Sequence, residues 1–186
     1  VIEDETITPL LHRLIAATAA PLGVVESAFA VDSTGFGTQC FYRHFTNKHG
    51  GREQVSRDYV KLHALVGTKT NVIASASITD RDRHDYNEFA PLLTEGAKSV
   101  TMAEVSADKA YIGQTNLDAA AAVGAEVYIP FKNNMVDHPK SALWTKLFHL
   151  YSYQKDEFFP HYHQRSNSES PFSAMKRLFS DTLRSK

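Results

Sequence analysis

Two apolar runs that each lead into an aspartate place the strongest constraint on the fold of this chain. Residues 28–31 precede Asp32, which a Ser-Thr-Gly sequence follows, and residues 99–107 precede Asp108. Apolar runs of this kind are typical of buried strands, and Ser-Thr-Gly after an aspartate is typical of a turn. If the two strands lie side by side and parallel, both carboxylates reach the same edge of a sheet, where they repel unless a cation lies between them.

The remaining segments predict the other strands and the helices around this sheet. Thr8-Pro9 is a suitable helix start, because threonine can cap a helix and proline is tolerated in the first turn, and this helix is expected to end near Pro21. The other predicted strands cover residues 39–45, 59–66, 72–78 and 126–130, and the other predicted helices cover residues 84–93, 116–123, 139–153 and 167–179, with a loop between the last two. This order predicts an α/β fold, with a mixed sheet of about five strands flanked by helices.

Size and charge restrict the classes of protein that fit. A chain of 186 residues with 42% hydrophobic residues is sufficient for one well-packed core, so a single domain is expected. The net charge of -1 excludes nucleic-acid binding through bulk positive charge and leaves local basic patches. One cysteine cannot form an internal disulfide, and no charged segment precedes an apolar N-terminal core, which predicts an intracellular protein. The apolar stretches around residues 10–20 and 117–123 are shorter than a membrane span, so membrane insertion is not expected.

Around both aspartates the sequence resembles the insertion-sequence transposases that have a ribonuclease H-like DDE domain. Residues 30–35, Ala-Val-Asp-Ser-Thr-Gly, are similar to the first catalytic strand of that family. Residues 107–111, Ala-Asp-Lys-Ala-Tyr, are similar to its second-aspartate motif, which usually has glycine where Ala110 stands. Further similar segments are residues 61–63, 79–80, 84–85 and 128–134.

The most specific part of this resemblance lies near the C-terminus. Tyr162, Arg165, Glu169 and Lys176 are separated by two, three and six residues, which is the spacing of the Tyr-Arg-Glu-Lys signature of these transposases. The resemblance implies a single DDE catalytic domain over residues 1–186, with a helical lead-in over 1–27 and a helical or loop segment over 133–164 before the catalytic helix. Relative to the family, a separate N-terminal DNA-recognition domain and a last C-terminal helix are expected to be missing.

The same resemblance implies the chemistry of a two-metal DNA transposase that cuts and rejoins DNA at insertion-sequence ends. Asp32 would bridge two divalent ions, Asp108 would bind one of them, and Glu169 would bind the other from a helix. Ligands that are all oxygens favour Mg2+ or Mn2+ over zinc. The residues expected to contact DNA are Tyr162, Arg165, Lys176, Lys61, Lys109 and Lys132. The implied partners are transposon ends, target DNA and a second copy of the chain, and the implied location is the cytoplasm, at the nucleoid.

Several residues of this chain also have a simpler structural interpretation. Ser166-x-x-Glu169 before an apolar run is a capping box, in which the glutamate only satisfies a helix-end amide. Asp108 and Lys109 form a possible surface charge pair, and Lys61 is either a phosphate contact or a solvated strand position. Trp144 has the helical spacing of a core residue, which favours core packing, and stacking on a displaced DNA base is the alternative.

Two other functions are compatible with the same sequence. A ribonuclease H-like nuclease that hydrolyses without strand transfer would have the same metal site. An inactive, host-adopted remnant would bind DNA or partners without chemistry, and the loss of one carboxylate would indicate it. Zinc binding at His161-x-His163 is disfavoured, because no cysteine or third histidine stands at zinc-like spacing.

Overall fold

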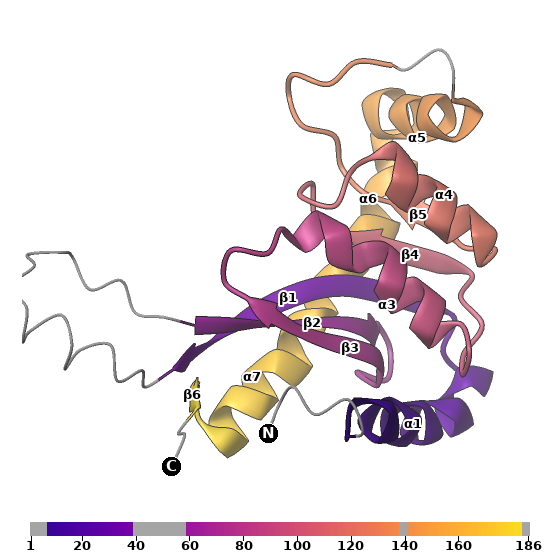
Figure 1. Ribbon diagram of the computed structural model, residues 1–186. Helices are drawn as coiled ribbons and strands as arrows, with labels where there is room; N and C mark the ends of the chain where they lie inside the picture. Colours follow the sequence, from indigo (N-terminus) through magenta and orange to yellow (C-terminus); the bar gives the residue numbers. More distant parts are fainter. Residues whose placement is uncertain (1–6, 39–58, 138–140, 184–186) are drawn as a thin grey trace, which may run out of the picture.

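A mixed sheet forms the centre of the part of the chain that the computed structural model describes, which is residues 7–38, 59–137 and 141–183 (Figure 1). Its strands are β1 (Ala28–Thr38), β2 (Tyr59–Gly67), β3 (Ile73–Asp80), β4 (Glu104–Ala107), β5 (Glu126–Tyr128) and the short β6 (Thr182–Leu183). The order is β3-β2-β1-β4-β5, and β6 pairs with the far end of β1. The β1–β2 and β2–β3 pairs are antiparallel, whereas β4 and β5 run parallel to β1. The predicted ribonuclease H-like α/β fold with a sheet of about five strands is confirmed.

The central strand β1 is longer than the sequence predicts. It continues six residues past Asp32 to Thr38, so the Ser-Thr-Gly segment after Asp32 is strand and the predicted turn is wrong. Gly35 pairs with Lys61 of β2, and this antiparallel ladder stabilises an extended backbone that local composition does not favour. The predicted strand over residues 39–45 lies outside the described residues.

Helices cover both faces of the sheet (Figure 1). They are α1 (Ile7–Ala19), the 3-10 helix η1 (Ala20–Val24), the 3-10 helix η2 (Asp85–Glu88), α3 (Phe89–Gly96), α4 (Gln114–Ala122), α5 (Ala142–Tyr153), α6 (Lys155–His163), the 3-10 helix η3 (Gln164–Ser168) and α7 (Glu169–Phe179). Phe89 and Leu93 of α3 belong to the main core cluster together with Leu65 of β2. Phe172 of α7 packs against Ala64 and Val66 in a second, smaller cluster. Helices α3 and α7 therefore lie on opposite faces of the sheet.

The loop predicted between the last two helices is wrong, because α6 and η3 occupy it. Helix α6 contains Pro160, which weakens a helix from within. Its aromatic side chains offset this cost: Phe158 is fully buried, with its ring centroid 5.9 Å from that of Tyr128 and 5.2 Å from that of Tyr151. Tertiary packing therefore determines this helix.

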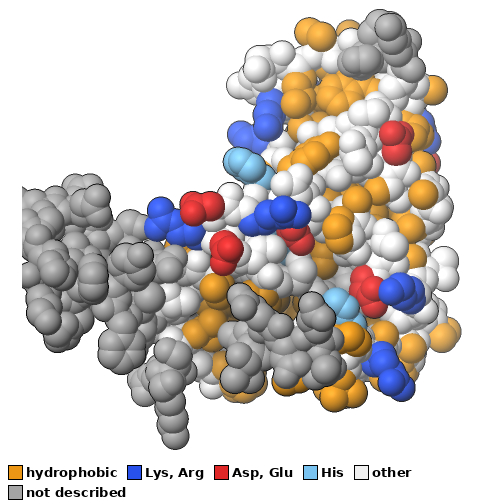
Figure 2. Space-filling view, in the orientation of Figure 1, with side chains coloured by type: hydrophobic (Ala, Val, Ile, Leu, Met, Phe, Trp, Pro, Cys, Tyr) orange, Lys and Arg blue, Asp and Glu red, His pale blue; other side chains and the backbone are white. Residues whose placement is uncertain are grey.

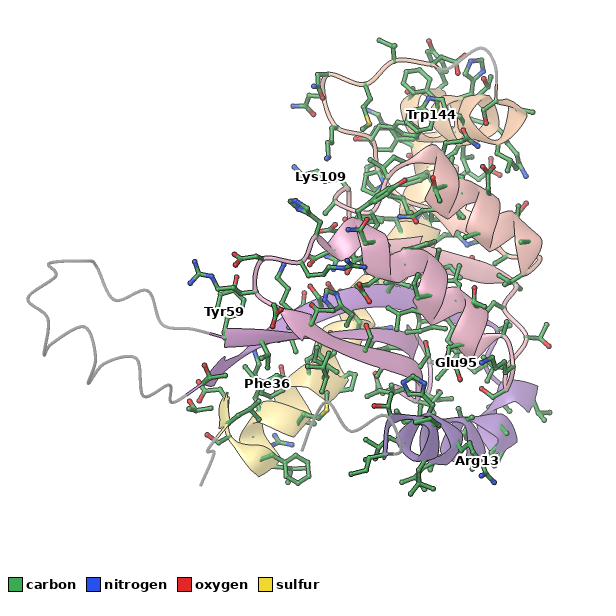
Figure 3. The ribbon with its side chains drawn as sticks, viewed as in Figure 1. Arg13, Phe36, Tyr59, Glu95, Lys109 and Trp144 are labelled. Atoms are coloured by element: carbon green, nitrogen blue, oxygen red, sulfur yellow. The ribbon has the colours of Figure 1, made fainter. Side chains whose placement is uncertain are left out.

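Trp144 of α5 is a core residue, as its helical spacing predicts. Its side chain is buried, and its ring centroid lies 5.0 Å from that of Phe131 in an edge-on arrangement (Figure 3). The indole Nε1 donates a hydrogen bond to the carbonyl oxygen of Val136 at 3.0 Å. Both the apolar ring and its one polar atom are satisfied within the fold.

Among the described residues, one helical segment, Ile7–Val24, is long and apolar enough to cross a membrane by length and composition. It comprises α1 and η1, and a signal sequence or a core helix would pass the same test. Only Ala19 of α1 is fully buried, whereas Leu10 and Leu14 remain more than half exposed. The segment is weak evidence of a membrane span.

Candidate active site

The structure brings Asp32 and Asp108 to the same level of two neighbouring parallel strands. Val31 of β1 is paired with Ala107 of β4. Asp32 directly follows Val31 in the sequence, and Asp108 directly follows Ala107. Residues in register on adjacent strands point to the same face of a sheet. The charge of Asp108 is one of the factors that raise the pKa of Asp32, which agrees with this placement.

Asp32 is a largely buried carboxylate, and both of its oxygens accept hydrogen bonds. Its Oδ2 atom accepts hydrogen bonds from Arg165 Nη1 and from the Ser168 hydroxyl, both at 3.0 Å. Its Oδ1 atom accepts the backbone N–H of Ser33 at 2.9 Å. Burial raises the pKa of Asp32 above its ordinary value, and the three donors only partly oppose this effect. A further positive charge beside Asp32 would therefore stabilise the site.

Asp108 is half-buried in the loop that follows β4. Its Oδ1 atom accepts the backbone N–H of Ala110 at 2.6 Å, a local turn that fixes the carboxylate close to the end of the strand. Ala110 does not adopt a positive φ, so the glycine usual in the family is not required here. Lys109 is exposed and projects from this loop away from the helices (Figure 3).

A third carboxylate, Asp85 of η2, lies near Asp32 in the structure but on the opposite face of the sheet, where it contacts Ser33, the residue after Asp32. Its Oδ1 atom forms an ion pair with Lys61 Nζ at 3.0 Å, and its Oδ2 atom accepts a hydrogen bond from the Ser33 hydroxyl at 3.2 Å. Lys61 also donates to the carbonyl oxygen of Arg83 at 2.8 Å. Sequence reasoning did not select Asp85 as a site residue, although residues 84–85 were part of the resemblance. Lys61 is thus an internally paired residue rather than a freely solvated one.

The structure does not bring Glu169 to the two aspartates. Glu169 is exposed and is the first residue of α7, and among the described residues no group of three His, Cys, Asp or Glu side chains is placed to hold a metal ion. On a continuous α-helix, Arg165 and Glu169 would share one face. The 3-10 helix η3 interrupts that helix, and with three residues per turn it aligns Arg165 with Ser168 instead.

The start of α7 also tests the structural interpretation of Glu169 as part of a capping box. The capping box is wrong, because the Ser166 hydroxyl donates to the carbonyl oxygen of His163 at 2.9 Å and Ser168 precedes the helix without a side-chain cap. Pro171 lies in the first turn of α7, where an absent backbone N–H breaks no helical hydrogen bond.

The other signature residues surround this segment. The Arg165 guanidinium carbon lies 5.9 Å from the ring centroid of Tyr162, and Lys176 Nζ lies 5.6 Å from that of Phe36, which puts Lys176 beside β1. Lys132 is exposed, in the stretch after β5. Figure 2 shows acidic and basic side chains interleaved across the middle of the displayed face, without a single continuous basic surface.

His161 has a structural role in the described part of the chain. Its Nδ1 atom pairs with the Glu104 carboxylate, and its ring is stacked on Tyr128 with centroids 4.4 Å apart. These contacts connect α6 to β4 and β5. They explain His161 without a metal ion.

The sheet order and the two aspartates at one level of its central parallel pair define a ribonuclease H-like arrangement, in which carboxylates gather beside the carboxyl end of a strand. The sequence model of the transposase DDE domain family matches residues 24–186, and the chain belongs to this family. The comparison with curated proteins found no match. Membership confirms the resemblance in the sequence and makes the chain a transposase-type nuclease or transferase, from a family that generally uses divalent metal ions.

Proposed function

We propose that this chain is the catalytic core of an insertion-sequence transposase that cuts DNA at the ends of the element and joins them to target DNA. The observation that carries the proposal is the position of Asp32 and Asp108 at one level of adjacent parallel strands, in a chain of the transposase DDE domain family. Asp32, Asp108 and Glu169 are the proposed catalytic residues. The proposed assembly is a homodimer on paired transposon ends, in the cytoplasm at the nucleoid.

The donor set of this site fits a hard divalent cation. Two carboxylates directly follow paired residues of neighbouring strands, and the burial of Asp32 leaves its charge only partly balanced by Arg165. Oxygen ligands favour Mg2+ or Mn2+. Asp32, Asp108 and Glu169 would hold the ions. Bound ions supply Lewis acidity to the attacking and leaving oxygens of a phosphodiester.

Glu169 would reach the aspartates only after a rearrangement of the first turn of α7, with η3 kept in its register. Glu169 directly follows Ser168, whose hydroxyl already contacts Asp32, so a local change of backbone direction after Ser168 is sufficient to change the face that Glu169 occupies. In the proposed enzyme this change accompanies the binding of DNA and metal.

The proposed role of Tyr162, Arg165, Lys176, Lys109, Lys132 and Lys61 is to hold the DNA backbone. A guanidinium suits two hydrogen bonds to one phosphate, and a lysine suits a single charged contact. Arg165 and Lys61 are engaged with Asp32 and Asp85, so they would exchange a carboxylate for a phosphate. Exposed Lys109 and Lys132 need no such exchange.

The test is cleavage and joining of a labelled DNA carrying pre-cut element ends, with Mg2+ or Mn2+, by the wild type and by Asp32→Ala, Asp108→Ala and Glu169→Ala. We expect each substitution to abolish both reactions. The matched control is Asp118→Ala, which removes a carboxylate on α4 whose hydrogen bond, within the described part of the chain, is to Gln114 in the same helix. Undiminished cleavage by a site variant contradicts the role of that residue. Hydrolysis without joined product favours the nuclease alternative, and DNA binding without cleavage favours the inactive remnant.

A further inference from the structure

We propose that Asn167 and Gln164 are positioning residues that determine which face of η3 meets Asp32, through their contacts with Thr68 in the turn between β2 and β3. The inference rests on the proposed function, because it assumes that Asp32 takes part in the chemistry. Neither residue contacts Asp32. Their influence would pass through the orientation of Arg165 and Ser168.

A buried glutamate, Glu26, holds the turn between β2 and β3 in place. Glu26 is 1% exposed and lies just before β1. Its Oε2 atom accepts the backbone N–H groups of Lys69 and Thr70, both at 2.9 Å, and the Thr70 hydroxyl at 3.0 Å. Hydrogen bonds to a carboxylate are stronger than those between neutral groups. The turn is therefore tied firmly to the start of the strand that carries Asp32.

Gly67 shows how closely this glutamate and the turn approach each other. A Cβ atom at position 67 would lie 2.7 Å from Glu26 Oε2 and 2.8 Å from its Cγ atom. Both distances are shorter than the contacts that Cβ atoms make in real proteins, so a larger residue would displace the carboxylate from the turn. The absence of a side chain at Gly67 allows the carboxylate to reach the backbone.

Thr68 of the β2–β3 turn forms hydrogen bonds with two side chains of η3. The Asn167 side-chain amide donates to the carbonyl oxygen of Thr68 at 2.9 Å. The Thr68 hydroxyl lies 3.1 Å from the carbonyl oxygen of Ala28 and 3.1 Å from the side-chain amide oxygen of Gln164. Thr68 is 4% exposed, so its position is fixed on several sides. The side chains of η3 that contact the turn are thus those at positions 164 and 167.

Because η3 is a 3-10 helix, its contact with the β2–β3 turn determines which of its side chains face Asp32. With three residues per turn, side chains at i and i+3 lie in one row, so Gln164 and Asn167 form one row and Arg165 and Ser168 form the next. The first row faces the turn and the second faces Asp32. A slip of one residue would rotate the rows by about 120° and remove both contacts with Asp32. The orientation of Glu169, which follows directly, depends on the same register.

The size of the expected effect separates positioning from general stability. A single hydrogen bond contributes only a small part of the stability of a folded domain, so losing the Asn167 contact leaves the fold intact. A displacement of about 1 Å at reacting groups can cost on the order of 100-fold in rate. A positioning role therefore predicts a large loss in rate with a small loss in stability.

The test uses Asn167→Asp, which keeps the size of the side chain but lacks an amide donor. The rate of cleavage is measured at saturating DNA and metal, with DNA affinity, thermal unfolding and backbone hydrogen exchange. The matched control is Thr145→Val, which removes the Thr145–Asp137 hydrogen bond of 2.7 Å at α5. We expect N167D to lower the saturated rate by about ten-fold or more, to change DNA affinity by less than about two-fold, and to speed exchange over residues 164–169. The control should lower the unfolding temperature similarly and affect neither the rate nor exchange in η3.

Three outcomes would overturn the inference. A wild-type rate in N167D removes the positioning role and leaves the proposed function standing. Rate losses in N167D and T145V that both follow the fall in unfolding temperature assign Asn167 a stability role only. A wild-type chain that cleaves no DNA with either metal overturns the proposed function, and the inference with it.

Discussion

Replacing Arg165 with glutamine should increase the affinity of the site for a divalent ion when DNA is absent. Arg165 Nη1 lies 3.0 Å from Asp32 Oδ2, an oxygen that a bound ion would need, and the two side chains are 22% and 17% exposed. At an effective dielectric constant of about 20, unit charges about 4 Å apart attract by about 4 kcal/mol. Desolvation of both groups offsets much of this, leaving on the order of 1 to 2 kcal/mol. Because about 1.4 kcal/mol corresponds to ten-fold, the expected gain in affinity is about 5- to 30-fold.

The assay is titration of Mn2+ into the DNA-free protein, with free ion followed by electron paramagnetic resonance. Lys109→Gln is the control, because it removes a positive charge beside Asp108 without vacating Asp32 Oδ2. It should produce a smaller gain than R165Q. Unchanged affinity in R165Q, or an equal gain in K109Q, would refute competition between Arg165 and the ion. In the wild type, a DNA phosphate that binds Arg165 should also strengthen ion binding, because coupling between two ligands is reciprocal.

Three further predictions concern stability and pH. Glu26→Ala leaves two part-buried backbone N–H groups without their acceptor and should lower the free energy of unfolding by about 3 kcal/mol in urea denaturation, and a loss below about 1 kcal/mol would contradict the anchoring role. Burial lowers the pKa of His63, so the unfolded chain takes up a proton below about pH 6.5 while the folded chain does not, and the free energy of unfolding should fall as the pH drops below that value. His63→Gln should show a smaller fall between pH 7 and pH 5.5, and an equal fall would assign it to other groups. Trp144→Phe should cost about 1 kcal/mol through its lost hydrogen bond while DNA cleavage stays unchanged, and a selective loss of cleavage would instead indicate contact with a base.

The sequence predicts the sheet well where local patterns and tertiary pairing agree. The apolar residues of β1 and β4 are buried on both faces, so their hydrophobicity alone indicates strands. The pattern fails after Asp32, because only pairing with β2 makes Ser-Thr-Gly extended. It fails again at α6, where Pro160 argues against a helix and the buried ring of Phe158 stabilises one. Both failures occur where distant contacts override local propensity.

Some features of the candidate site can be predicted from the sequence, and others cannot. Asp32 and Asp108 can be predicted to converge, because each follows a recognisable strand. The contact of Arg165 with Asp32 cannot, because a guanidinium suits a carboxylate and a phosphate equally well. The exposure of Glu169 follows from the 3-10 geometry of η3, which differs from an α-helix by about 20° per residue. A sequence pattern with four well-spaced identities does not resolve that difference.

The continuation of β1 beyond Asp32 makes the two aspartates mechanically unequal. Asp32 lies inside an eleven-residue strand and pairs with Ala64 of β2, whereas Asp108 follows the last residue of a four-residue strand. Opening the backbone at Asp32 requires breaking the centre of the sheet, while the Asp108 loop can shift at much lower free energy. Asp32 is thus the fixed reference of the pair, and adjustment to ions of different radius should fall mainly on Asp108.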